Sequence, residues 1–271
     1  MSETTLIGNT LNRDAWLLGH EITPNLEKAL STEVIAHYRQ KKGDIIPALQ
    51  RGFLLPGTLP PPAVSVEVAG YPIEETDCIV WLSHAEQFVE QYFGMKVNLR
   101  EMFPLPTRLP WKQILPIFDP VELNNRQMVD KALKAQGLNV WEGTKVEEFT
   151  GATAGASKLY LIERTAKPVP ATMGLPPKYA RHWFSGRQTL PLHLRGYGIG
   201  TGLLYKVEKQ FLDPQAATAS WFPENTFPAG GGVAYGFYDP DYRKVHFLRS
   251  AAGDGDADYG FREAIVLSLH T

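Results

Sequence analysis

The sequence predicts an α+β protein in which helices dominate the first half of the chain and short strands dominate the end. Apolar residues recur at helical spacing in several segments between 23 and 137. Residues 219–271 instead read as short strands joined by Gly, Asp and Pro turns. With 271 residues, 44% of them hydrophobic and 21% charged, the chain suits one large globular domain or two small ones. We expect a helical N-terminal region over 1–95 and a second domain over 96–271.

In the N-terminal region, Thr23 and Pro24 form a helix start, and Gly43 is positioned to end that helix. A proline-rich connector follows over 56–72, and its alternating run at 64–68 is typical of an edge strand or a surface arm. A further helix is predicted after Ser83, with Gly94 at its end.

The middle of the chain alternates strands and helices. An apolar run at 114–118 predicts a strand. The clearest helix pattern comes next, because Asp119 and Glu122 have capping-box spacing, Pro120 suits a first turn and Gly137 suits a helix end. Further strands are predicted at 138–142 and 158–164, a short helix near 177–184, a glycine turn at 196–202 and a helix over 202–212.

Charge and cysteine content narrow the function classes. The net charge of −2 gives no reason to expect a nucleic acid or an anionic membrane as partner. No apolar run reaches the length of a membrane span and no signal-peptide pattern is present, so we expect a cytoplasmic protein, with surface display as an alternative. The single cysteine, Cys78, forms no internal disulfide and is expected to be buried as a small apolar residue.

Two local patterns resemble ligand-binding motifs but lack residues that those motifs require. The run GYGIGTG at 196–202 has Thr201 or Leu203 where a dinucleotide fingerprint needs glycine, which favours tight backbone packing over phosphate binding. The run DGDADYG at 254–260 alternates carboxylates as a calcium loop does. Tyr259 and Ile265 stand where an EF-hand needs glycine and glutamate, so a polar loop is favoured, with a loose metal site as the alternative.

The remaining sequence motifs give weaker indications of a ligand or catalytic site. The triplet PEN at 223–225 matches a sugar-binding triplet of lectins over three residues only. No histidine pair has metal-ligand spacing, and no hydrolase, metalloprotease or kinase motif is present. We therefore expect no cofactor, no metal site and no catalytic residue. The histidines are His20, His37, His84, His182, His193, His246 and His270.

The stretch 230–264 combines aromatic residues and aspartates with glycine-rich backbone. Because side chains alternate across a strand, Val245 and Phe247 take one face and His246 and Leu248 the other. On the preceding strand, Tyr235, Phe237 and Asp239 share a face, and Gly236 keeps the opposite side thin. Two neighbouring strands would then present Tyr235, Phe237, His246 and Leu248 outward together. Such a mixture of Tyr, Ser, Gly and Asp is typical of a paratope.

The sequence GGGVAYGFYDPDYRKVHFLRSAAGDGDADYGFREAIVLSL, residues 230–269, resembles the C-terminal variable region of diversity-generating retroelement proteins. The resemblance rests on the GGGV lead, the piece Arg243-Lys244-Val245 and the closing Gly260-Phe261-Arg262, and residues 191–203 are similar to the same group. It implies a C-type-lectin-like fold related to formylglycine-generating and sulfatase-modifying enzymes. The variable region would cover about 230–260.

The resemblance also implies a mechanism of diversification. A reverse transcriptase copies a template with errors at adenines, and the copy replaces the 3′ end of the gene. An Asn codon of the AAC type then becomes a codon for Tyr, Asp, His, Ser, Gly, Phe, Leu or Arg. The ligand-binding residues expected on this basis are Tyr235, Phe237, Asp239, Tyr242, His246, Leu248, Arg249, Ser250, Asp254, Asp256 and Asp258.

The scaffold of this region would comprise Val233, Val245, Phe247, Phe261 and Ile265. We expect a non-catalytic binding protein with a protein ligand. The alternatives are an enzyme of unknown type related to sulfatase-modifying proteins, or a structural or phage-type interaction module.

Overall fold

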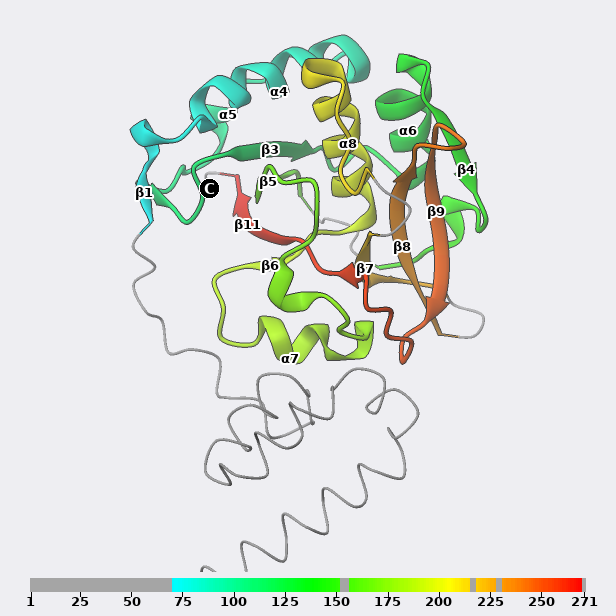
Figure 1. Ribbon diagram of the computed structural model, residues 1–271. Coiled ribbons are helices and arrows are strands. Elements are labelled where there is room, and N and C mark those ends of the chain that lie inside the picture. The colour runs from blue at the N-terminus through cyan, green and yellow to red at the C-terminus, as the bar shows by residue number, and fades with distance from the viewer. Residues whose placement is uncertain (1–69, 152–155, 215–217, 228–230, 270–271) are drawn as a thin grey trace, which may run out of the picture. The chain divides into compact units, whose positions relative to one another are not determined.

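A computed structural model describes residues 70–151, 156–214, 218–227 and 231–269 (Figure 1). These residues belong to the second of the two units into which the chain divides, Pro61–Thr271. The helix predicted at 23–43 and the alternating run at 64–68 lie outside the described residues. Helices and sheets are mixed along the chain, which confirms the predicted α+β class.

Two long helices, α4 (Cys78–Phe93) and α8 (Leu194–Glu208), accompany many short elements. The short helical segments are η1 (Ile73–Glu75), α5 (Leu99–Met102), α6 (Asn125–Met128), the π-helical η2 (Val129–Leu133), η3 (Lys134–Gln136), η4 (Val146–Glu148), η5 (Pro170–Thr172), η6 (Pro177–Tyr179) and α7 (Ala180–Phe184). The strands are β1 (Tyr71–Pro72), β2 (Arg108–Leu109), β3 (Ile114–Asp119), β4 (Asn139–Glu142), β5 (Lys158–Glu163), β6 (Leu190–Pro191), β7 (Ala219–Thr226), β8 (Gly232–Asp239), β9 (Lys244–Ala251), β10 (Tyr259–Gly260) and β11 (Glu263–Ser268).

The strands form a two-stranded, a four-stranded and a five-stranded sheet. The four-stranded sheet has the order β3-β5-β11-β6 and is antiparallel throughout. The five-stranded sheet has the order β10-β7-β8-β9-β4, in which the central pairs are antiparallel and both edge strands, β10 and β4, pair in parallel. The last residues of the chain therefore contribute to both of the larger sheets.

Helix α8 contacts both larger sheets, through β3 on one side and β8 on the other (Figure 1). Its glycines make this close approach possible. A Cβ at Gly200 would lie 2.7 Å from Ile117 Cδ1 of β3, and a Cβ at Gly202 would lie 2.2 Å from the carbonyl oxygen of Ala132. The aromatic ring of Tyr197 packs against the five-stranded sheet. Glycine at these positions lets one helix serve as the core of both sheets.

The glycine run at 196–202 was predicted as a turn, and that prediction is wrong, because these residues lie inside the continuous helix α8. The alternative of tight backbone packing is correct. Tertiary contacts outweigh the helix-breaking tendency of glycine, which is about 1 kcal/mol per residue relative to alanine. The helix predicted over 202–212 therefore begins and ends later in the sequence than α8 does.

The other predicted elements differ from the structure mainly at their starts. Gly94 and Gly137 end their helical segments with positive φ, as predicted. α4 begins at Cys78 rather than after Ser83. The predicted cap at Asp119 is wrong, since Asp119 ends β3 and is buried, and the capping box consists of Asn124 and Gln127. A buried partner for Asp119, the guanidinium of Arg195 at 2.7 Å, explains why the carboxylate is not a cap.

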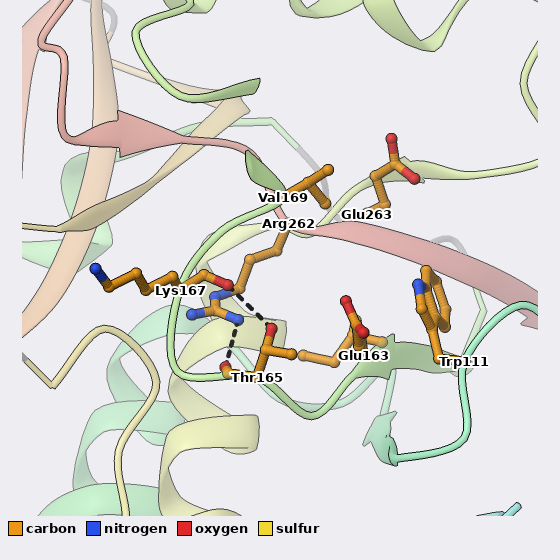
Figure 2. Close-up of a pocket in the computed structure, with 8 residues that line it drawn as sticks. Trp111, Glu163, Thr165, Lys167, Val169, Arg262 and Glu263 are labelled. Carbon is orange, nitrogen blue, oxygen red and sulfur yellow. Dashed lines mark hydrogen bonds between the residues drawn. The ribbon is translucent and has the colours of Figure 1, made fainter. Parts of the chain in front are cut away.

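Arg262 lies between β10 and β11, where the chain passes from one larger sheet to the other, and its side chain is 3% exposed. It donates a hydrogen bond to the carbonyl oxygen of Thr165 (Figure 2) and another to that of Ala166, both of which follow β5. It also forms an ion pair with Asp213 at 3.0 Å and donates to the hydroxyl of Ser220 on β7. The closing arginine of the Gly260-Phe261-Arg262 motif is thus a structural connector between the sheets.

Replacing Arg262 by Met would leave the buried Asp213 carboxylate without its cation. We expect the free energy of unfolding to fall by about 3–5 kcal/mol. The double variant with Asp213→Asn removes the stranded charge and should recover part of the loss. Urea unfolding of wild type, single and double variants measures both effects, and equal stability of the two variants would contradict the assigned role of the ion pair.

Candidate functional site

The five-stranded sheet presents Tyr235, Phe237, His246 and Leu248 on one face, as predicted. β8 and β9 pair so that Tyr235 lies opposite Leu248 and Phe237 lies opposite His246. We call this side of the sheet the outer face, since it is the side away from α8.

The opposite face of the same strands packs on α8. Val245 and Phe247 are fully buried there, and the Tyr197 ring of α8 lies 6.3 Å from the Phe247 ring. Gly236 leaves little room for a side chain, because a Cβ would lie 3.2 Å from the Phe222 ring. Among the other predicted scaffold residues, Phe261 is buried and Ile265 is partly buried against the core. Val233 is also buried, but its register places it on the same face as Tyr235.

The outer face is an almost continuous array of rings. Phe237 and His246 stack with 4.7 Å between ring centroids and an angle of 10° between the planes. Tyr235 stacks on Phe237 at 6.3 Å, and Trp141 of β4 contacts His246 at 5.0 Å. At the other side, Trp221 of β7 and Tyr259 of β10 both contact Tyr235. Rings from all five strands of the sheet therefore form one connected array, in which Trp221 is fully buried.

The expectation that the whole set is open to solvent is wrong for its central members. Phe237, His246 and Asp239 are each only 9% exposed, whereas Tyr235 and Leu248 are half-buried. Stacking of neighbouring rings covers the flat faces of Phe237 and His246, and this leaves little area for water. The array is a packed platform whose outer members are the accessible ones.

His246 has no hydrogen-bond partner at either ring nitrogen within the described part of the chain. Desolvation lowers the pKa of its imidazole, and the nearby charge of Lys244 acts in the same direction, against the opposing charge of Asp239. The ring is therefore neutral around pH 7 and offers one acceptor and one donor nitrogen.

The turn between β8 and β9 is held by Asp239. Its carboxylate accepts hydrogen bonds from the backbone N–H groups of Asp241 and Tyr242, so the predicted role of Asp239 as a free ligand contact is replaced by a structural one. Tyr242 is 69% exposed at the tip of this turn. Arg243 completes the turn with a φ of 52°.

Arg249 does not extend the outer face, contrary to expectation. It pairs with Ala234 and so alternates onto the opposite side, where its guanidinium carbon lies 4.2 Å from the centroid of the Phe227 ring. The next residue, Ser250, donates a hydrogen bond to Asp254, and Asp254 also accepts from the backbone N–H of Ala251. The side chains of Ser250 and Asp254 therefore stabilise the loop after β9.

Asp256 and Asp258 remain exposed beside the tyrosine pair of the outer face. The charge of Asp256 contributes to raised pKa values of Tyr235 and Tyr259, behind the larger effect of burial. Within the described residues, no group of three or more His, Cys, Asp or Glu side chains is arranged to hold a metal ion. Within the 254–258 loop, Asp254 and Asp256 instead accept local hydrogen bonds.

The remaining sequence candidates have structural partners. Asn225 of the PEN triplet is buried, and its amide oxygen accepts a hydrogen bond from the N–H of Leu194 at the start of α8. Cys78 is fully buried, as predicted, and burial raises the pKa of its thiol to about 12. A protonated, buried thiol is a poor nucleophile.

Two hollows lie away from the outer face. A cavity of about 420 Å³ borders the loop before α6, with Arg195 among its lining residues, but Asp119 already neutralises that arginine. The hollow beside Arg262 in Figure 2 is much smaller, at about 10 Å³.

Trp141 is the site residue that sequence reasoning missed. It is 47% exposed and belongs to β4, which is distant in sequence from residues 230–264. The alternation Asn-Val-Trp-Glu predicts a strand with Trp141 on one face, but the pairing of β4 with β9 is a long-range contact that no local pattern encodes.

Comparison with protein-family models, with curated proteins and with solved structures finds no significant match to the chain. Among the described helices, none combines the length and apolar character that crossing a membrane requires.

The lowered pKa of His246 predicts a pH-dependent stability. Below the ordinary histidine pKa of about 6.5, an unfolded chain takes up a proton that folded His246 resists, so the free energy of unfolding falls as the pH decreases. His246→Phe keeps a stacked ring and removes this titration. Its loss of stability between about pH 7.5 and about pH 5 should therefore be smaller than that of wild type.

Urea unfolding at both pH values is the measurement. Tyr235→Phe is the matched control, because it alters the same face and keeps the imidazole; it should retain the wild-type pH dependence. An unchanged pH dependence in His246→Phe would show that the ring does not resist protonation.

Proposed function

We propose that the protein is a non-catalytic binding protein and that the outer face of the five-stranded sheet is its ligand-binding surface. The observation that carries the proposal is the strict alternation on β8 and β9. Val245 and Phe247 are fully buried in the core, where Phe247 contacts Tyr197 of α8, while their neighbours His246 and Leu248 lie on the outer face with Tyr235 and Phe237. Side chains on the outer face can change without altering the packing of the core.

The composition of this face suits recognition of a protein. Stacked rings supply contact area with few rotatable bonds, and their packing limits the entropy lost on binding. At one margin of the face, Trp141 is well exposed, and Tyr242 is exposed in the turn between β8 and β9. Between residues 221 and 271 there are seven acidic and four basic residues, a net charge of −3, which disfavours nucleic acid as ligand.

We further propose that this surface is diversified by retroelement-mediated mutagenesis at adenines, and that residues 96–271 form a C-type-lectin-like domain. The resemblance of residues 230–269 supports both points. The outer-face residues Tyr235, Phe237, His246 and Leu248 are all of types reachable from an AAC codon. The closing Gly260-Phe261-Arg262 motif has a structural role that explains its place after the variable stretch, since Arg262 joins the sheets.

We first expect substitutions on the outer face to cost less stability than substitutions on the core face. Tyr235→Ser and Leu248→Ser change half-buried outer-face residues, so each should lower the free energy of unfolding by about 1 kcal/mol or less. Phe247→Ala, on the core side of the same strand as Leu248, should cost about 3–5 kcal/mol because it opens a cavity beside Tyr197. Urea unfolding measures all three, and comparable losses on both faces would overturn the assignment.

The second test concerns diversification and uses DNA. We expect a near-copy of the segment encoding about residues 230–260 beside a reverse transcriptase gene, with differences concentrated at adenines of the template. Sequencing the flanking DNA in several isolates settles the point. A flanking region without such a repeat would refute diversification while leaving the binding face testable by substitution.

A further inference from the structure

Strand β11 (red in Figure 1) has strand partners on both sides over only its first two residues. β6 pairs with β11 at Glu263 and Ala264 and extends no further, whereas β5 pairs with it as far as Ser268. After Ala264, the side of β11 that faces away from β5 therefore has no strand partner within the described residues. We call residues Ile265–Leu269 the free edge.

The free edge is apolar and unprotected. Ile265, Val266 and Leu267 are only partly buried against the core, and Leu269 is 37% exposed. The residues opposite the first three, 159–161 of β5, have strand partners on both sides and are almost completely buried. Edge strands are usually protected by charged residues, proline or a bulge, and the free edge has no charged residue and no proline. A further strand would bury it as β5 is buried.

The backbone of the free edge offers hydrogen-bonding groups to such a strand. The N–H of Leu192, just after β6, donates to the carbonyl oxygen of Arg262, so the backbone groups of Arg262 face β6. Because backbone groups alternate between the two sides of a strand, those of Val266 and Ser268 face the same way, where no described strand follows. An extended polypeptide supplies donors and acceptors at this spacing, so a β-strand is the occupant that this edge fits.

The free edge is complementary to itself. When two copies pair in antiparallel orientation about a two-fold axis at Leu267, Val266 of each copy lies opposite Ser268 of the other, and these residues exchange N–H···O=C hydrogen bonds. In the same register Leu267 lies opposite its own counterpart, and Ile265 lies opposite Leu269. These three leucine and isoleucine positions share one face of the strand, so the contact on that face is apolar and brings no like charges together.

We propose that two copies of the chain associate through the free edge of β11, which joins their four-stranded sheets into one continuous sheet. A two-fold dimer is the commonest assembly of soluble proteins, and it requires a self-complementary contact of this kind. Because the contact is confined to Ile265–Leu269 of each copy, we expect a weak dimer. The dimer would carry two outer faces, a consequence that rests on the proposed binding function.

Sedimentation velocity of the full-length protein tests the association. The monomer has a mass of 30.2 kDa. We expect the sedimenting mass to rise towards twice the monomer mass as the protein concentration increases from about 5 µM to about 500 µM. A protein that stays monomeric over this range would overturn the proposal.

Ser268→Pro tests the backbone pairing. It removes an N–H that faces the free edge and that β5 does not use, so the fold should be retained, and urea unfolding checks this. The dimer loses half of its hydrogen bonds across the axis, and its dissociation constant should rise by about tenfold or more. Ser268→Ala is the matched control, because it changes the same side chain and keeps the N–H. It should leave the dissociation constant within about twofold of wild type.

Leu267→Cys locates the axis, because directly opposed residues of an antiparallel pair are close enough for a disulfide. Mild oxidation should give a covalent dimer on a non-reducing gel. Val80→Cys, at a position of α4 that is 59% exposed, should give much less, and the native Cys78 is fully buried. Equal cross-linking of the two cysteine variants, or a dimer that is as strong in Ser268→Pro as in wild type, would overturn the proposal. None of these outcomes bears on the tests of the outer face, so the two proposals fail separately.

Discussion

The buried ion pair between Arg262 and Asp213 is the constraint on which the rest of this fold depends. It lies where the chain leaves β10 of one sheet and enters β11 of the other, and it also engages the segment after β5 and the start of β7. A guanidinium can meet this demand because it offers five donors in a plane. Loss of the arginine would remove these contacts between the two sheets and leave a buried carboxylate without its cation.

With the two sheets joined at this point, α8 packs against both. The close contacts of Gly200 and Gly202 bring the helix backbone against β3 and η2, and Tyr197 fills the space toward β7 and β9. One face of the five-stranded sheet is thereby committed to the core. The other face does not pack on α8, so the two faces of this sheet are under different packing constraints.

The outer face is nevertheless more ordered than a set of exposed side chains. Phe237 and His246 cover each other, Asp239 holds a turn and Asp254 holds a loop. Such internal support holds the rings of Trp141 and Tyr235 against the array. A surface that changes in sequence would need a support of this kind in order to stay structured.

Local sequence by itself determined the α+β class, most of the strands, the helix ends at Gly94 and Gly137, and the side of the strand on which Tyr235, Phe237, His246 and Leu248 lie. These features follow from backbone preferences and from the two-residue period of strands, which act over a few residues. Tertiary structure alone decided that 196–202 is helical, that Asp119 pairs with Arg195 instead of capping a helix, and that Trp141 joins the outer face. It also decided that Phe237 and His246 are covered. Each of these outcomes depends on contacts between residues distant in the chain, because packing and burial are properties of the assembled core and leave no local periodic signal.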